Sequence, residues 1–393
     1  MKTNKLPIRS ISMFLLIFTT ILFGSHFYMW ARIDYYLSLS VLHKVGLALW
    51  LGGLPLLTLF AMRNMRRLPK ALAKIVAWII YPWMGIALLF FVTLLVTDSL
   101  WLILQLVPDY HLPEPRAFLQ HCFGIMALST TSVLVVFSLY KGLQAVSVKS
   151  VTIFLERLPA SFNGLRIVQM TDLHIGPLIK GDWLRRVVQR VNLLQPDIIV
   201  ITGDLVDGSV HELRHHVEPL AHLQSKYGTY FVTGNHEYYS GVEEWCAYLT
   251  SLGVQVLRNR RVTIQSSAAE SFELVGVDDW ASHHFPGGGA NLAKALQGYN
   301  TDSLLLLLAH QPAAVIEAAE YGVDLQLSGH THGGQIWPFN YLVPLQQPYI
   351  KGLSRHKDTR TQIYVSSGTG FWGPPMRLGT QAEITHITVL QGI

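Results

Sequence analysis

Four long runs of apolar residues lie within the first 150 residues of the chain, at residues 11–30, 37–62, 75–107 and 117–140. A helix needs about 20 apolar residues to cross the hydrocarbon core of a bilayer. The runs therefore predict four membrane-spanning helices and a membrane domain over residues 1–145. The third run contains Pro82 and Asp98, so it is expected either to tilt or to end near Thr97 and continue along the interface. Asp98 lies near the end of its run, where interfacial water would solvate it.

The charges of the chain are divided between two parts. Residues 1–150 hold 13 Lys and Arg against 4 Asp and Glu, a net charge of +9, whereas the other residues hold 17 against 21, a net charge of −4. Basic residues gather before the first run (Lys2, Lys5 and Arg9), between the second and third, and after the fourth. The positive-inside rule then places the C-terminal part in the cytoplasm. Because that part is mildly acidic, no nucleic-acid partner is expected.

After residue 150 the pattern changes to short apolar runs that alternate with amphipathic segments. Strands are predicted at residues 165–170, 197–202, 229–233, 272–277, 304–309, 324–327, 362–366 and 383–390. Helices are predicted at 182–194, 242–252, 290–296 and 312–321. This alternation is typical of a layered α/β fold, which we assign to residues 146–393.

Asp, Asn or His residues follow five of these strands directly. In chain order they occur in Thr171-Asp172-Leu173-His174, Gly203-Asp204-Leu205-Val206-Asp207, Gly234-Asn235-His236-Glu237, His310, and Gly329-His330-Thr331-His332-Gly333-Gly334. Ligands of open α/β sheets bind outside the carboxyl ends of the strands. A single such motif occurs often by chance, and a lone His is more often an ordinary core or surface residue. Five motifs in order, each at a strand end, favour a common site.

Carboxylate, amide and imidazole side chains suit hard or borderline divalent metals. The five motifs provide enough ligands for two ions, and a carboxylate such as Asp204 can bridge them. Two metals about 3.5–4 Å apart activate water and hold a phosphoryl group. Only two cysteines, Cys122 and Cys246, are present, so neither a disulfide framework nor a cysteine zinc site is expected.

The ordered motifs resemble those of the calcineurin-like metallophosphoesterase superfamily. This resemblance covers roughly residues 150–393 and implies a four-layer αββα sandwich, here preceded by the α-helical four-span membrane domain. The opening Leu-Arg-Ile-Val-Gln-Met-Thr-Asp-Leu-His and the form Gly-His-Thr-His-Gly-Gly-Gln are similar to a membrane-associated bacterial subgroup. That subgroup includes phosphodiesterases and enzymes similar to UDP-2,3-diacylglucosamine hydrolase.

The resemblance implies a role for each motif residue. Asp172, His174 and His332 would bind a first metal, Asn235, His310 and His330 a second, and Asp204 would bridge both. His236, oriented by Asp207, would stabilise the transition state or protonate the leaving oxygen. A metal-bridging hydroxide would attack phosphorus in line. Glu237, which replaces the Asp of many relatives, is expected to matter little because it is not a required ligand.

Two other groups of residues have open interpretations. Asp278, Asp279, His283 and His284 precede a glycine-rich stretch and are expected to form a solvated turn, although they could shape substrate entry. Arg377 could contact a phosphate through bidentate hydrogen bonds or serve in structural pairing.

The sequence therefore predicts a phosphoesterase anchored in the bacterial inner membrane, with its catalytic domain on the cytoplasmic face. It would use two divalent ions (Mn, Fe or Zn, with Mn favoured) and hydrolyse a phosphodiester or pyrophosphate. Because the domain is tied to membrane spans, a lipid-linked substrate and contact with membrane lipid are expected. The alternative is a catalytically silent membrane sensor or scaffold that binds metal or nucleotide, which a missing ligand would favour.

Overall fold

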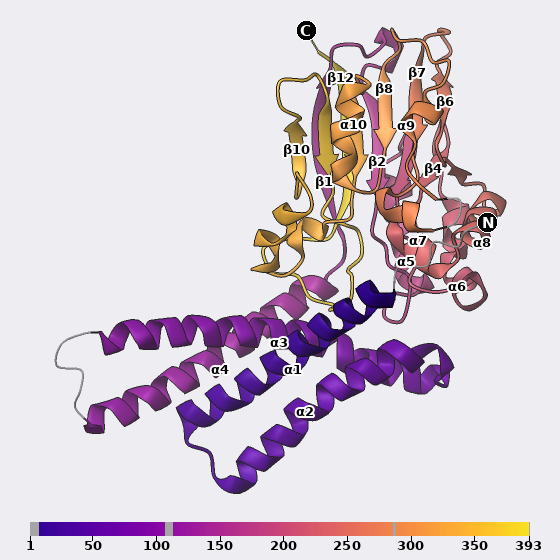
Figure 1. The fold of residues 1–393 in the computed structure, drawn as a ribbon. Coiled ribbons are helices and arrows are strands. Elements are labelled where there is room, and N and C mark those ends of the chain that lie inside the picture. Colours follow the sequence, from indigo (N-terminus) through magenta and orange to yellow (C-terminus); the bar gives the residue numbers. More distant parts are fainter. Residues whose placement is uncertain (1–7, 107–112, 286–287, 393) are drawn as a thin grey trace. The chain divides into compact units, whose positions relative to one another are not determined.

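The computed structural model describes residues 8–106, 113–285 and 288–392. The chain divides into two compact units (Figure 1). The helical unit comprises residues 1–141 and 373–376, and the α/β unit comprises residues 142–372 and 377–393. Lys2 and Lys5, which entered the prediction of orientation, lie outside the described residues. The predicted domain boundary at residue 145 stays a prediction.

Four long helices make up most of the helical unit: α1 (Ile8–Leu37), α2 (Val41–Asn64), α3 (Lys70–Gln105) and α4 (Pro113–Leu143). Among the described residues, three helical segments are long and apolar enough to cross a membrane, Val41–Asn64, Ala71–Gln105 and Arg116–Leu143. By this measure the described residues contain three candidate spans, one fewer than the four predicted. In α1, His26 lies within the first apolar run, and Arg32 and Asp34 follow that run in the last turns of the helix.

Helix α3 continues without a break to Gln105, although it contains Pro82 and Asp98. The prediction that it could end near Thr97 is wrong. The Asp98 carboxylate accepts hydrogen bonds from the Arg32 guanidinium (2.7 and 2.9 Å), from the Tyr36 hydroxyl (2.7 Å) and from Tyr28. Partners on α1 thus satisfy this acidic group, which the sequence had assigned to interfacial water. A paired carboxylate costs far less to hold among apolar helices than an isolated one.

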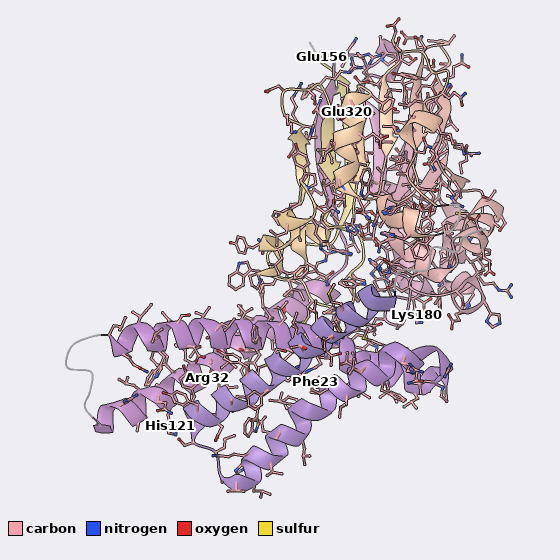
Figure 2. The ribbon with its side chains drawn as sticks, viewed as in Figure 1. Phe23, Arg32, His121, Glu156, Lys180 and Glu320 are labelled. Carbon is pink, nitrogen blue, oxygen red and sulfur yellow. The ribbon has the colours of Figure 1, made fainter. Side chains whose placement is uncertain are left out.

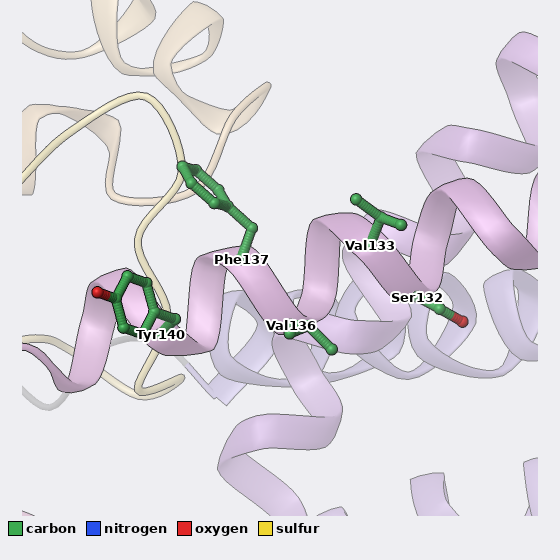
Figure 3. Close-up of a pocket in the computed structure, with 5 residues that line it drawn as sticks. All are labelled: Ser132, Val133, Val136, Phe137 and Tyr140. Atoms are coloured by element: carbon green, nitrogen blue, oxygen red, sulfur yellow. The ribbon is translucent and has the colours of Figure 1, made fainter.

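One side of α4 presents a shallow hollow lined by Ser132, Val133, Val136, Phe137 and Tyr140 (Figure 3). Spacings of three and four residues put these side chains on one face of the helix. Most of them are apolar and exposed; Val133 and Val136, for example, are each about two-thirds exposed. Such a surface suits lipid and offers nothing to bind a phosphoester.

Two six-stranded mixed sheets form the α/β unit. The first has the order β1-β12-β2-β3-β4-β5, and the second has the order β10-β11-β9-β8-β7-β6. The strands of the first sheet are β1 (Ser147–Leu155), β2 (Leu165–Met170), β3 (Ile198–Thr202), β4 (Thr229–Val232), β5 (Gln255–Val256) and β12 (Glu383–Gln391). Those of the second are β6 (Arg260–Gln265), β7 (Ser271–Gly276), β8 (Leu305–Leu308), β9 (Leu325–Ser328), β10 (Gly352–Arg355) and β11 (Gln362–Val365).

Helices cover the outer faces of the two sheets, which gives the four layers expected from the sequence. Those packed on the first sheet are α5 (Gly181–Leu193), α6 (Val210–Val217) and α8 (Val242–Ser251), with α7 (Asn235–Ser240) before α8. Those on the second are α9 (Leu292–Ala295) and α10 (Val315–Glu320). The αββα fold class is thereby confirmed.

Both faces of the central strands are apolar because each strand contributes to two cores. In β3, Ile198 and Val200 belong to the core between the sheets, whereas Ile199 and Ile201 pack against the helices. In β8, Leu306 and Leu308 point to the inner core and Leu305 and Leu307 to the outer one. A period of two with both faces buried produces the continuous apolar runs seen in the sequence.

Candidate metal centre at the carboxyl ends of five strands

The five motifs lie at one edge of the two sheets, which we call the site edge. It is formed by the carboxyl ends of β2, β3 and β4 in the first sheet and of β8 and β9 in the second. The buried side chain of Gln169 at the end of β2 donates to the Ser328 carbonyl at the end of β9, 2.9 Å away, and so joins the sheets there. Figure 2 shows Lys180, just after the first motif, at one end of the α/β unit and Glu156 and Glu320 at the other.

The first group of ligand atoms comes from the first and last motifs. The Nε2 atoms of His174 and His332 lie 3.1 Å apart, and His332 Nε2 lies 3.4 Å from Asp172 Oδ1. All three side chains are buried. These atoms are mutually close enough to hold one metal ion.

The second group joins Asp204, His310 and His330. His310 Nε2 lies 3.2 Å from both Asp204 Oδ2 and His330 Nδ1. The same Asp204 oxygen lies 3.9 Å from His174 Nε2 in the first group. Asp204 thus stands between the two groups, where a bridging carboxylate would have to be.

Hydrogen bonding fixes which ring nitrogens can bind a cation. His310 Nδ1 donates to the Thr202 carbonyl (2.7 Å) and His174 Nδ1 donates to Asp207 Oδ1 (3.0 Å). Their Nε2 atoms therefore carry lone pairs that point into the two groups. Asn235 adds a buried side-chain oxygen that accepts no hydrogen bond in the described part of the chain. Several lone pairs that converge on one point, with few N–H or O–H donors of the protein beside them, form a site suited to a divalent cation.

His236 lies beside Asp204 and shares Asp207 with His174. Its Nδ1 donates to Asp207 Oδ1 at 2.6 Å, and its Nε2 lies 3.9 Å from Asp204 Oδ2. Burial would lower the pKa of His236, but the carboxylates of Asp204 and Asp207 raise it to about 9. Burial would likewise raise the pKa of Asp204, but the imidazoles of His310 and His236 hold it well below its usual range. These shifts favour the charged form of the His236 imidazole beside the ionised Asp204 carboxylate.

The backbone at the ligand positions adopts a conformation that side chains other than glycine rarely take. Five candidate ligand residues have φ between 47° and 71°, namely Asp172, His174, Asp204, His330 and His332. Glycines next to them permit close approach: a Cβ on Gly234 would collide with Asp204, and one on Gly329 would collide with Thr171 and Asp172. Strain of this kind clusters at functional sites and is maintained by the surrounding contacts.

Glu237 supports the centre in a way that the sequence did not reveal. Its fully buried carboxylate accepts hydrogen bonds from the backbone N–H groups of Asp204 (3.0 Å), Leu205 (2.8 Å) and Gly234 (2.7 Å). Burial and the charge of Asp204 raise its pKa to about 7. The expectation that Glu237 matters little was based on ligand identity alone, whereas the side chain positions the loop that carries Asp204.

Arg377 is a structural residue. It is fully buried, and its guanidinium donates to the backbone carbonyls of Ser367 (2.8 Å), Gly370 (2.6 Å), Gly368 (3.2 Å) and, at 3.4 Å, His332. Burial lowers its pKa to about 10. Of the two interpretations left open by the sequence, structural pairing is the one found.

Asp278 and Asp279 are buried, so the expectation of a solvated turn is wrong for them. Asp278 accepts from the Arg258 guanidinium at 2.8 and 3.2 Å, and Asp279 accepts from the Gln311 amide at 3.0 and 3.1 Å. Nearby His283 and His284 are exposed, as a turn requires. Partners distant in the chain, which local composition cannot reveal, account for the difference.

The sequence model of the calcineurin-like phosphoesterase family matches residues 165–334, which include all five motifs. A Bos taurus protein named "Transmembrane protein with metallophosphoesterase domain" is 45% identical over 272 residues, covering 67% of this chain and 61% of that protein. A Helicobacter pylori protein named "Uncharacterized metallophosphoesterase" is 40% identical over 252 residues (64% and 66%). The Bacillus subtilis "Uncharacterized metallophosphoesterase YkuE" is 30% identical over 284 residues, covering 70% of this chain and 96% of that protein.

The chain therefore belongs to the calcineurin-like metallophosphoesterase family. It spans less than two thirds of the length of the bovine and Helicobacter proteins that it matches.

Replacing Glu237 by Gln should weaken metal binding about 10- to 100-fold, as the loss of supporting hydrogen bonds around metal ligands usually does. In the parent the backbone N–H groups donate to both carboxylate oxygens of Glu237, whereas a Gln side chain would place its NH₂ group, itself a donor, against some of them. Metal retained after dialysis against a graded chelator, measured by mass spectrometry, tests this. Glu244→Gln, an exposed site on α8, is the control. Equal retention by the two variants would contradict the positioning role.

Replacing Asp279 by Asn should raise the free energy of unfolding of the variant relative to that of the parent as the pH rises from about 4 to 6. Burial raises the pKa of Asp279 to about 6 from an ordinary 3.8, so the folded state takes up a proton in this range. This proton stabilises the folded parent fully below about pH 4, and the stabilisation is lost as the pH rises to about 6. For a pKa shift of about two units the loss amounts to about 3 kcal/mol. Urea unfolding of the metal-free full chain in detergent, at pH 4 to 7, measures the difference between variant and parent. A pH-independent difference would contradict a raised pKa.

Proposed function

We propose that this protein is a membrane-anchored metallophosphoesterase that hydrolyses a phosphodiester or pyrophosphate with two divalent cations. The observation that carries the proposal is the Asp204 carboxylate, whose Oδ2 lies within 3.9 Å of His174 Nε2 in one group and 3.2 Å of His310 Nε2 in the other. Asp172, His174 and His332 would hold the first cation, Asn235, His310 and His330 the second, and Asp204 both. Two bound cations would polarise the phosphoryl oxygens and lower the pKa of the attacking water.

The protein's own residues account for the proton transfer. His236 would donate a proton to the leaving oxygen, because its Nδ1 is engaged with Asp207 and its Nε2 remains available on the Asp204 side. The carboxylate of Asp207 holds the imidazole in this tautomer and favours its charged form. A pKa above neutrality makes His236 suited to act as an acid rather than as a base.

The presence of membrane helices in the same chain as the catalytic domain supports a substrate that is itself held in the membrane. Three apolar helices precede the α/β unit, and the bovine relative is named a transmembrane protein. We propose that residues 1–145 anchor the catalytic domain, residues 146–393, at the cytoplasmic face of a bacterial inner membrane, and that the substrate is a lipid-linked phosphoester or pyrophosphate. Mn²⁺ is the preferred choice for the cation, and Fe²⁺ and Zn²⁺ also suit the ligands.

Two substitutions should separate metal binding from proton transfer. Asp204→Asn removes the bridging charge and should abolish both bound metal and activity. His236→Ala should retain metal but lower kcat on a phosphodiester by about 10²- to 10⁴-fold, the usual contribution of a general acid. Hydrolysis of bis(4-nitrophenyl) phosphate, nucleotide sugars and lipid-linked pyrophosphates by the Mn²⁺-loaded full chain provides the assay. His215→Ala, at an exposed position of α6, is the control. Failure of the parent chain to hydrolyse any phosphoester would sink the proposed function.

The proposed orientation predicts that a reporter fused to the C-terminus is active only if the reporter works in the cytoplasm. A fluorescent protein that folds there should be bright, and an alkaline phosphatase that needs export should be inactive. The same reporters fused after residue 112, in a loop poor in positive charge, should give the opposite result. Alkaline phosphatase activity at the C-terminus would reverse the assignment.

A further inference from the structure

An uncharged segment with exposed apolar side chains follows the last metal-binding motif. Residues 336–350 contain no Asp, Glu, Lys, Arg or His. Within them, residues 337–345, which we call the apolar loop, expose five large side chains: Trp337 (39%), Phe339 (47%), Tyr341 (68%), Leu342 (54%) and Leu345 (80%). Clusters of this kind on a protein surface mark contact with another molecule or with a membrane.

Hydrogen bonds fasten the chain at both ends of the segment. At its start, the Gln335 side chain exchanges hydrogen bonds with the backbone of Trp372, donating at 2.9 Å and accepting at 2.9 Å. At its end, the hydroxyl of Thr331, which lies between His330 and His332, donates to the Ile350 carbonyl. The apolar loop is therefore held at the site edge and follows His332 by only a few residues.

Trp372 extends this surface to the reacting groups. Its indole is half exposed, and its ring centroid lies 6.2 Å from that of His236. The exposed ring of Tyr239 also lies near His236, with ring centroids 5.5 Å apart. Two exposed aromatic rings thus lie beside the candidate general acid, and the backbone of Trp372 is joined to Gln335 just before the segment that contains the apolar loop.

The chain enters the α/β unit at the same edge. Strand β1 pairs in parallel with β12, which is antiparallel to β2, so Ser147 at the start of β1 lies at the level of the end of β2. Helix α4 ends at Leu143, and only three residues separate it from Ser147. The four steps from Leu143 to Ser147 span at most about 14 Å. The edge that carries the metal centre is thus the edge at which the unit is tethered to a membrane helix.

We propose that the apolar loop and Trp372 dock onto the lipid bilayer that holds the helices and so present the metal centre to phosphoesters in the headgroup layer. The chemistry of the surface fits this partner. Trp and Tyr prefer the membrane interface, where an apolar ring and a polar tip are both accommodated, and the absence of charge over residues 336–350 avoids the cost of desolvating ions. Docking itself depends only on the membrane anchor; its benefit for a lipid-linked substrate rests on the proposed function.

The first experiment measures docking without reference to activity. The full chain carrying Cys122→Ser and Leu345→Cys is labelled with an environment-sensitive fluorophore and reconstituted in nanodiscs with spin-labelled phosphatidylcholine. Cys246 is buried, and the Cys122→Ser chain without an added cysteine must remain unlabelled. Leu193→Cys is the matched control, because Leu193 is 83% exposed against 80% for Leu345 and lies at the end of α5 that precedes β3, opposite the site edge.

Quenching at residue 345 should exceed quenching at residue 193 by about threefold or more, as insertion of the loop into the interface requires. Equal, weak quenching at the two positions would overturn the proposal. It would also be overturned if labels at residue 345 remained unquenched while cysteines at this position crosslinked two copies of the chain, since the surface would then be a self-association interface.

The second experiment tests the benefit for catalysis. The double variant Tyr341→Glu/Leu345→Glu should lose about tenfold in kcat/KM on a phosphoester embedded in vesicles of phosphatidylcholine and phosphatidylglycerol, because charged side chains oppose insertion. It should hydrolyse soluble bis(4-nitrophenyl) phosphate within about twofold of the parent rate, as should Leu193→Glu on both substrates. Equal losses on both substrates would contradict a docking role. If the parent hydrolyses neither substrate, the proposed function fails while the quenching result still decides docking.

Discussion

The position of the Asp204 carboxylate is the constraint on which the rest of the site depends. One of its oxygens faces imidazoles from both ligand groups, and the other accepts the His236 backbone N–H at 2.9 Å. The residue itself is held in a left-handed conformation by hydrogen bonds from its own N–H and that of Leu205 to Glu237. In the proposed centre this carboxylate would bridge two cations, so a small displacement would disturb the binding of both. The glycines around Asp204 and the buried Glu237 keep this one carboxylate in position.

Much of the α/β fold could be predicted because its central strands bury both faces. Residues 198–201 of β3 and all of β8 are apolar, and the polar residues that follow them stand out for that reason. Strand β1 was missed because its residues 147–152 alternate without a clear apolar face and are only half buried or exposed. The third run was expected either to tilt or to end near Thr97, yet the helix continues and Asp98 accepts hydrogen bonds from Arg32 and two tyrosines of α1. A partner 62 to 70 residues away leaves no trace in the local pattern.

The candidate ligands could be predicted because metal chemistry restricts their type and because each lies at the end of a strand. The residues that support them could not. Glu237 and Asp279 are carboxylates whose burial depends on backbone N–H groups and on an amide brought together only by the fold. Arg377 could by its type either contact a phosphate or serve in structural pairing, and it is directed at carbonyl oxygens. Residue type indicates what chemistry is available, whereas the surrounding donors and acceptors decide whether it is used for binding or for support.

The hydrogen bonds of Arg377 have a consequence for the unfolding of the molecule. One guanidinium joins the carbonyls of residues 367, 368 and 370 to that of His332, so the loop that follows β11 and the last metal-binding motif are connected through a single cation. Segments that share buried partners open and close together as one cooperative element. Metal binding would then slow the amide hydrogen exchange of residues 367–377, although none of these residues is a candidate ligand. The C-terminal loop would thus report on the metal state of a centre built from residues far earlier in the chain.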